Sequence, residues 1–302
     1  MCGASSCPHM APPGPSVCEK DEAEVSKIWF VTGSSRGLGR AVVTAALEAG
    51  DRVVATARDT ASLDDLVARY GERVHPLVLD VTDMGQVMQA VRDGWKVFGR
   101  LDVVVNNAGY ADLASVEDIT ADDFRAQIDT NFYDVVHVSK AALPILRKQG
   151  SGHIFQVSSL GGRIGSAGLA AYQSAKWAVG GFSTVLAQEV APFGIKVTVL
   201  EPGAMRTDWA GSSMTVPAVS EPYQLTVGAF ADMIRNADPE AAKAHSADPA
   251  RVARAIVDLA GDQDAPLRLL LGRDAVQYAS AAAEQLAASD EKWRPLAGSV
   301  WE

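Results

Sequence analysis

Tyr172 and Lys176 are the two residues whose types and spacing point most directly to acid–base chemistry. They are four positions apart, so on a helix both side chains lie on one face, one turn from each other. An ammonium group beside a phenol favours the phenolate, and is therefore expected to lower the phenol's pKa from its ordinary value of about 10. Such a tyrosine can act as a general acid or base near neutral pH. Ser159 ends the apolar run HIFQVS, and its hydroxyl can hydrogen-bond the same substrate oxygen.

The YxxxK spacing alone does not distinguish this chemistry from an ordinary exposed helix, which can carry the same two residues. The elements that position the pair decide between the two interpretations. Seven short apolar segments, typical of strands covered on both faces, alternate with helical patterns. The expected strands are 28–32, 51–58, 73–81, 101–109, 152–159, 195–203 and 268–272.

Helical patterns occupy the intervals between these strands. Thr82 is the expected N-cap of the helix 82–99, and a Thr120-x-x-Asp123 cap begins a long helix that Pro144 is expected to break or kink. The other expected helices are 40–50, 60–71, 171–194, 249–260 and 275–289. This alternation predicts an α/β fold in which helices cover both faces of a parallel, doubly wound sheet.

Glycines 33, 37 and 39 form a GxxxGxG turn between the first strand and the first helix. This arrangement points backbone N–H groups and a helix N-terminus at a phosphate, although a tight turn without a ligand has the same pattern. In such sheets, ligands bind outside the carboxyl ends of the strands. The residues singled out at those ends are Asp80, Asn106–Gly109, Ser159 and Pro202–Gly203.

The composition is that of a globular protein that binds neither nucleic acid nor anionic membranes. The chain has 302 residues, 48% of them hydrophobic, with a formal net charge of −10. Nucleic acids and anionic membranes both attract basic surfaces, and no apolar run approaches the roughly eighteen residues of a spanning helix. Cys2, Cys7, Cys18 and His9 match no usual zinc spacing, so no metal is expected.

One domain accounts for most of the chain. Residues 1–26 are rich in proline, glycine and serine and are expected to form a disordered extension. They lack a secretory pattern, which favours a cytoplasmic location. The domain is expected over 27–290, with an apolar substrate lid at 204–248 that is too long for a simple connection. Residues 291–302 are expected to form a tail whose two tryptophans are covered by other parts of the protein.

In combination, these motifs resemble the short-chain dehydrogenase/reductase family, in its shorter, classical form. The resemblance extends over about 28–272 and implies a single Rossmann-type domain with a seven-stranded parallel sheet and a helical lid. It also implies an oxidoreductase that transfers hydride between a nicotinamide and a carbonyl or secondary alcohol. The catalytic residues that it implies are Asn131, Ser159, Tyr172 and Lys176.

The family's motifs also assign the ligand contacts. The expected cofactor-binding residues are Gly33, Ser35, Arg36, Gly37, Leu38, Gly39, Arg58, Asp80, Val81, Asn107, Ala108, Gly109, Tyr172, Lys176, Pro202, Gly203 and Thr207. The expected substrate-binding residues are Ser159, Tyr110, Leu160, Met205, Trp209 and Met214, which favour a hydrophobic carbonyl or alcohol. The resemblance further implies a homodimer or homotetramer built on the helix after Phe124 and the helix that carries Tyr172.

The end of the second strand favours NADP(H) over NAD(H), although NAD(H) stays possible. NAD-specific relatives have an acid at this strand end that would repel a 2′-phosphate. Here the strand ends at Ala57 and Arg58, and Arg36 in the glycine turn can reach the same phosphate. Asp59 is expected to point away, as the start of the next turn.

Three other functions share part of this pattern. A dinucleotide-binding regulator or scaffold would keep the fold but would need neither Tyr172 nor Ser159. A sugar-nucleotide epimerase or dehydratase usually has a GxxGxxG turn and a larger C-terminal domain. An NAD-dependent alcohol dehydrogenase would share the chemistry and differ in the cofactor.

Overall fold

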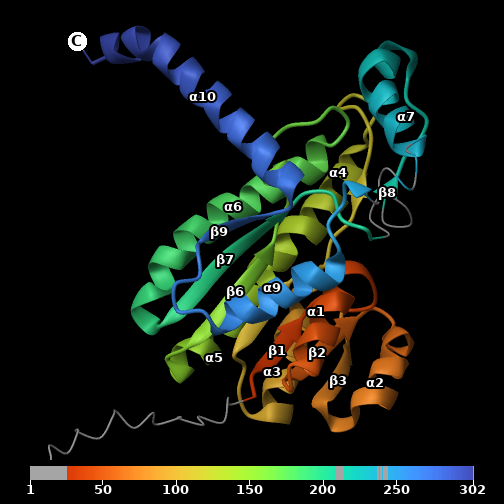
Figure 1. Cartoon of the computed structure of the whole chain (residues 1–302), viewed down its shortest axis with the longest axis vertical. Coiled ribbons are helices and arrows are strands. Elements are labelled where there is room, and N and C mark those ends of the chain that lie inside the picture. Colours follow the sequence, from red (N-terminus) through yellow and green to blue (C-terminus); the bar gives the residue numbers. More distant parts are fainter. Residues whose placement is uncertain (1–25, 208–213, 237, 239, 241–243, 302) are drawn as a thin grey trace, which may run out of the picture.

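A seven-stranded parallel sheet forms the centre of the molecule (Figure 1). The computed structural model describes residues 26–207, 214–236, 238, 240 and 244–301. The strand order is β3-β2-β1-β4-β6-β7-β9, which confirms the predicted doubly wound α/β fold. The strands are β1 (Ile28–Val31), β2 (Arg52–Ala57), β3 (Val74–Val78), β4 (Val103–Asn106), β6 (Gly152–Val157), β7 (Ile195–Pro202) and β9 (Arg268–Leu271).

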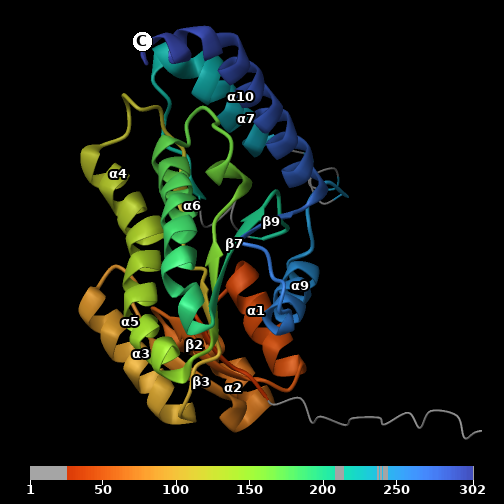
Figure 2. The same cartoon turned by 90° about the vertical axis from the view of Figure 1, so that its left-hand side faces the viewer.

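Helices cover both faces of this sheet (Figure 2). Successive strand residues face opposite sides, so Trp29 of β1 enters one core and Phe30 enters the other. The first core is covered by α1 (Gly37–Glu48), α2 (Asp64–Tyr70) and α9 (Pro249–Gly261). The second is covered by α3 (Met84–Phe98), α5 (Asp134–Gln149) and α6 (Ala170–Val190).

The N-cap of α3 is Asp83, so the prediction of Thr82 is wrong by one residue. The Asp83 carboxylate accepts hydrogen bonds from the N–H groups of Gly85 and Gln86 at 2.8 and 3.1 Å. The Thr82 hydroxyl donates instead to Asp80 at 2.7 Å. A carboxylate is the stronger acceptor for the exposed N–H groups at a helix start.

A break at Pro144 is also wrong, because α5 continues through this residue to Gln149, whereas the alternative, a kink at Pro144, stays a prediction. Proline removes the hydrogen bond to the carbonyl of residue 140. Lys140 is exposed, so water can satisfy that carbonyl. The irregular turn lies earlier: α4 (Ala121–Ile128) passes into α5 through a π-helical turn, Asp129–Tyr133. The predicted cap is present, since Thr120 accepts from the N–H of Asp123 at 3.0 Å.

Two features at the C-terminal side of the sheet depart from the expected pattern. β5 (Ala111–Asp112) and β8 (Met214–Thr215) form a separate two-stranded sheet between the lid and the domain. The lid continues into α7 (Ala229–Arg235). The last helix, α10 (Arg273–Ser299), runs through the expected domain boundary at 290 and extends away from the domain (Figures 1 and 2). Trp293 and Trp301 on it are 55% and 95% exposed, so the described residues do not supply the expected cover.

Candidate active site

A cleft of about 1560 Å³ opens at the carboxyl ends of the strands. It is lined by most of the residues that the sequence singled out. They are Gly33, Ser35, Arg36, Gly37, Leu38, Arg58, Asp80, Val81, Asn107, Ala108, Gly109, Tyr110, Asn131, Ser159, Leu160, Tyr172, Lys176, Pro202, Gly203, Met205 and Thr207.

Two expected contact residues do not line this cleft, and a third, Trp209, lies outside the described residues. A side chain on Gly39 would place its Cβ 2.3 Å from the Gly33 carbonyl oxygen, so Gly39 serves close packing behind the turn. Met214 is 9% exposed and packs in a small apolar cluster of the lid that also contains Leu113 and Tyr172. The spacing of residues in the sequence cannot distinguish a residue that lines the cleft from one, such as Gly39 or Met214, that packs behind its wall.

The glycine turn presents a helix N-terminus to the cleft. Gly33 and Gly37 have φ values of 65° and 57°, in the left-handed region that glycine adopts at low cost. The N-cap residue Arg36 does not cap α1 with its side chain. Among the described residues no side chain caps this helix start, and Gly37 and Leu38 line the cleft, so the first N–H groups of α1 suit an anion, as at a dinucleotide pyrophosphate site. This turn fits a nicotinamide dinucleotide.

The segment after β4 fixes the position of that turn. The Thr32 hydroxyl accepts hydrogen bonds from the N–H groups of Asn107 and Ala108 at 2.9 and 3.1 Å. The Asn107 amide donates in return to the carbonyl oxygens of Thr32 and Gly33, at 3.0 and 3.1 Å. These four bonds join the ends of β1 and β4, so the cofactor turn and the floor of the cleft form one unit.

Tyr172 and Lys176 lie one turn apart on α6, as predicted, and both are buried. The Lys176 ammonium donates to the carbonyl oxygen of Val157 at 2.9 Å and lies 5.6 Å from the centre of the Tyr172 ring. Ser159 follows β6 and its side chain is hydrogen-bonded to Tyr172. The structure therefore brings the three side chains to one wall of the cleft.

Burial raises the pKa of Tyr172 to about 12, while the hydrogen bond with Ser159 acts in the opposite direction. The predicted lowering of this pKa by Lys176 is therefore wrong. Removing a phenolate from water costs more than the nearby cation returns. Burial also lowers the pKa of Lys176, and the carboxylate of Asp134 opposes that shift.

Asn131 joins this group from the π-helical turn. Its amide donates to the carbonyl oxygens of Tyr110 and Gln127, both at 2.9 Å. A Cβ atom on Gly109 would lie 2.7 Å from Asn131 Oδ1 and 3.6 Å from Lys176 Nζ. Both side chains therefore border Gly109, and a side chain at this position would crowd Asn131. A π-helical turn often marks a functional position in a helix.

The adenosine side of the cleft carries two cations. Arg36 and Arg58 are both exposed and both line the cleft. Asp59 accepts a hydrogen bond from the N–H of Ala61 at 3.0 Å. Its carboxylate is therefore engaged in the next turn, as the sequence predicted.

Residues 27–216 match the family model described as short chain dehydrogenase. The chain belongs to this family. It is 64% identical over 273 residues to an oxidoreductase, BOA17, of Botryotinia fuckeliana. The aligned region covers 90% of this chain and 98% of that protein. A short-chain dehydrogenase from Streptomyces avermitilis superposes with a TM-score of 0.85 at 37% identity, over 92% of this chain and 99% of that one.

More distant relatives include a reductase and a protein with NADP bound. A 3-oxoacyl-[acyl-carrier-protein] reductase of Salmonella typhimurium is 36% identical over 182 residues, 60% of this chain and 75% of that protein. The structure of ElxO with NADP bound has a TM-score of 0.67 at 27% identity, over 82% of this chain and 96% of that one. This short-chain dehydrogenase is therefore an enzyme that interconverts an alcohol and a carbonyl group with a nicotinamide dinucleotide. Among the described residues, no helix is long and apolar enough to span a membrane.

Sequence reasoning missed two buried acids of this short-chain dehydrogenase. Glu201, near the end of β7, is fully buried and paired with Arg163 and Arg268. Asp134, at the start of α5, is also fully buried. Glu201 interrupts an otherwise apolar strand, which was an available signal. Asp134 follows Asn131 by three residues and so lies on the same helix face.

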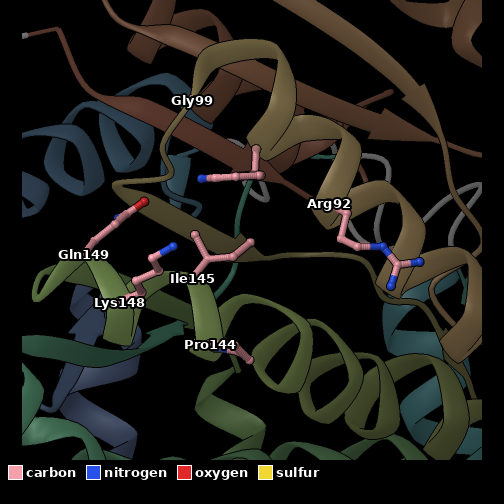
Figure 3. Close-up of a pocket in the computed structure, with 7 residues that line it drawn as sticks. Arg92, Gly99, Pro144, Ile145, Lys148 and Gln149 are labelled. Atoms are coloured by element: carbon pink, nitrogen blue, oxygen red, sulfur yellow. The ribbon is translucent and has the colours of Figure 1, made fainter.

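A second cavity, of about 430 Å³, lies between α3 and α5 (Figure 3). Its lining includes Arg92 from α3 and Pro144, Ile145 and Lys148 from α5. It contains none of the residues that the short-chain dehydrogenase motifs assign to the reaction, so the candidate active site is the larger cleft.

Proposed function

We propose that this short-chain dehydrogenase is an NADP(H)-dependent ketoreductase that acts on a hydrophobic carbonyl or secondary alcohol. The observation that carries the proposal is the placement of Ser159, Tyr172 and Lys176 in the cleft that the cofactor turn also lines. A protein that only bound dinucleotide would not need a buried phenol hydrogen-bonded to a serine there.

Each side chain has a proposed role. NADPH, when bound, supplies the hydride. Tyr172 donates its proton to the carbonyl oxygen during reduction and accepts it during oxidation. Ser159 donates a hydrogen bond to that oxygen and polarises the carbonyl. Lys176 stabilises the phenolate that Tyr172 becomes, and Asn131 orients the polar groups around Lys176.

Tyr172→Phe tests the assignment, because it removes the transferable proton and keeps the ring in its packing. We expect ketone reduction to fall by about 10²-fold or more, with NADPH affinity nearly unchanged. Tyr70→Phe, which removes a hydroxyl from α2 outside the cleft, should retain the parent rate. Activity of Tyr172→Phe within a few fold of the parent would rule out Tyr172 as the acid.

The preference for NADP(H) rests on the two arginines and on the engaged Asp59. Each charge-assisted hydrogen bond to a phosphate contributes about 1.5–3 kcal/mol. Two such bonds favour a 2′-phosphate by roughly 10²–10⁴ in affinity, at about 1.4 kcal/mol per tenfold.

Dissociation constants for NADPH and NADH test this preference. The Arg36→Ala/Arg58→Ala variant should lose most of the NADPH preference and keep its NADH affinity. Arg69→Ala removes one positive charge from α2 outside the cleft and should change neither constant. The proposal fails if the parent binds NADH more tightly, or if the double variant keeps the parent's ratio.

The remaining wall of the cleft favours an apolar substrate. Leu160, which follows β6, and four residues of the lid segment line it: Met205, Phe230, Met233 and Ile234. We expect kcat/KM to rise with the alkyl length of a series of methyl ketones, because each buried methylene group contributes about 0.8 kcal/mol.

We also propose that the enzyme is a homodimer or homotetramer and that α10 contributes to its interface. Apolar residues recur on this helix at spacings of three and four, as in a coiled-coil seam, with one interruption at Ser289. They are Ala279, Ala282, Leu286, Trp293, Leu296 and Val300. The last four are more than half exposed. An apolar stripe of this kind is complementary to the same stripe on a second copy of the chain.

A further inference from the structure

The part of the lid segment that spans 214–236 is joined to the loop 111–118 by backbone contacts. β5 and β8 pair in parallel. Directly after β5, the N–H of Leu113 donates to the carbonyl oxygen of Thr215 at 2.9 Å. The two segments are distant in the chain, so these contacts determine where the lid segment begins to pack on the domain.

Two carboxylates of the loop extend this contact through side chains. Glu117 accepts a hydrogen bond from the Tyr223 hydroxyl at 2.7 Å. Asp118 accepts two from Ser220, one from its hydroxyl at 3.0 Å and one from its backbone N–H at 3.3 Å. Hydrogen bonds to an ionised acceptor are stronger than those between neutral groups. These four residues, Glu117, Asp118, Ser220 and Tyr223, are called the latch below.

The protonation states of two latch residues suit these contacts. The hydrogen bond with Glu117 raises the pKa of Tyr223, because the phenolate would lose this bond and face a carboxylate. Hydrogen bonds with Ser115 and Ser220 lower the pKa of Asp118. Near neutral pH, Tyr223 is therefore a donor and Asp118 an acceptor, as the latch requires.

Tyr223 connects the latch to the wall of the cleft. It packs against an apolar cluster that includes Val227 of the lid segment and Tyr172 of α6. Phe230 and Ile234 pack against the same cluster, and both also line the cleft. The position of Tyr223 therefore bears on the apolar side chains that face the proposed substrate.

The lid segment also packs closely on the domain at Gly168, just before α6. Gly168 has a φ of 86°, in the left-handed region that favours glycine. A Cβ atom there would lie 3.0 Å from Val227 Cγ1 and 3.1 Å from Leu113 Cγ. Close packing beside α6 and the latch at the surface thus hold the lid segment at two places.

We propose that Glu117 and Asp118 are positioning residues that hold the lid segment through Tyr223 and Ser220, and so determine how strongly the enzyme selects a long apolar substrate. The latch itself does not depend on the reaction. Its effect on selectivity rests on the proposed ketoreductase function and on the apolar wall of the cleft.

Two double variants remove the latch from opposite sides. Glu117→Ala/Asp118→Ala takes away the two acceptors, which are exposed and so contribute little singly. Ser220→Ala/Tyr223→Phe takes away the two hydroxyl donors and keeps the Tyr223 ring in its packing. Because both variants break the same contact, the quadruple variant should show less than the sum of their effects.

The latch is tested without any activity, by NMR hydrogen exchange at two neighbouring N–H groups of the loop. The Leu113 N–H is bonded to the lid segment at Thr215, whereas the Ala114 N–H is bonded to the domain at Gly168. None of these four residues is changed in the variants. Loss of the latch should speed exchange at Leu113 about three- to tenfold, and exchange at Ala114 should stay at the parent rate.

A control variant and the second N–H group make this test decisive. Glu72→Ala/Asp258→Ala removes two exposed charges outside the latch and the cleft, and should follow the parent at both N–H groups. The latch is overturned if Leu113 exchanges at the parent rate in both double variants, or if Leu113 and Ala114 accelerate together. Should the loop-side variant fail to fold, the lid-side variant serves in the same comparison.

The effect on selectivity is measured along the series of methyl ketones. Without the latch, we expect KM of the longest ketone to rise about three- to tenfold, because the lid segment covers its alkyl chain less. KM of the shortest ketone, kcat and the dissociation constant of NADPH should stay nearly unchanged. An equal rise in KM at every alkyl length, or none, overturns the role in selectivity. Failure of the Tyr172→Phe test would remove the proposed reaction and leave hydrogen exchange at Leu113 unaffected.

Discussion

Tyr172 shows how burial and charge compete at a single side chain. Its neighbour Lys176 is a cation one helical turn away, yet burial raises the phenol's pKa to about 12. The protonated form therefore predominates throughout the neutral range, and the side chain is suited to give a proton to a carbonyl oxygen. The reverse reaction needs the phenolate, which is scarce near neutral pH.

The two directions of the reaction should consequently differ in their pH dependence. In the proposed mechanism alcohol oxidation requires deprotonated Tyr172, whose fraction rises tenfold per pH unit while the pH is below the pKa of about 12. We expect kcat/KM for oxidation to rise steadily from neutral to alkaline pH, whereas ketone reduction stays nearly level until Lys176 deprotonates. The measurement is a pair of pH–rate profiles on one alcohol and its ketone. Equal slopes in both directions would contradict a tyrosine of high pKa as the base.

The placement of the expected catalytic residues in one cleft could be predicted from sequence, but their environments could not. Ser159, Tyr172 and Lys176 carry their spacing in the chain, and Asn131 follows from the family resemblance. The sign of the Tyr172 pKa shift depends on how completely α6 is covered by the lid, which no local pattern specifies. Asp134 escaped notice because its burial depends on how α5 packs against the rest of the fold, which the sequence around it does not specify.

At the scale of elements, Glu201 ties three segments together. Its carboxylate accepts a hydrogen bond from Nε of Arg163 at 2.8 Å and another from Nε of Arg268, on β9, at 3.0 Å. Arg163 directly follows the short helical turn after Ser159. Glu201 immediately precedes Pro202–Gly203. One buried acid therefore holds the segments that follow β6 and β7 against the edge strand.

Glu201→Gln should destabilise the domain, because it leaves two arginines facing a neutral amide. Loss of one partner from a fully buried ion pair costs about 3–5 kcal/mol. Both arginine side chains are 32% exposed, so water compensates them in part and we expect about 2–3 kcal/mol. Urea unfolding measures this free energy, with Glu189→Gln on the exposed face of α6 as control. A loss no larger than the control's would show that the cluster contributes little.

The strands of the large sheet and most helices could be predicted because each spans enough residues for its apolar pattern to be identified. β5 and β8 have two residues each, too few for any period, and their pairing joins segments about a hundred residues apart. Helix ends were less predictable, as Asp83 and Thr82 show, since neighbouring polar residues compete for the same N–H groups. The extension 1–26 and its cysteines lie outside the described residues apart from Ser26, so its expected disorder stays a prediction.

At the scale of the whole molecule, α10 carries apolar side chains that the described part of a single chain leaves exposed to solvent. Replacing Leu286, Trp293 and Leu296 by glutamate places charge on the apolar stripe and should shift the enzyme toward smaller species in sedimentation velocity. Ala287→Glu/Ala288→Glu alters the side of the helix away from the stripe and should leave the assembly unchanged. An unaltered sedimentation coefficient in the triple variant would exclude the stripe from the interface.

The first turn of α10 also reaches the cleft. Asp274 accepts from the N–H of Ala204 at 2.7 Å, directly after Pro202–Gly203, and Tyr278 lines the cleft. A helix that both pairs with a second copy and supports a ligand loop makes ligand affinity and assembly thermodynamically linked, and such linkage is reciprocal. If paired α10 helices hold this loop in its binding form, dilution weakens cofactor binding and cofactor opposes dissociation by the same factor. The concentration of the enzyme then becomes one of the variables that set its own affinity.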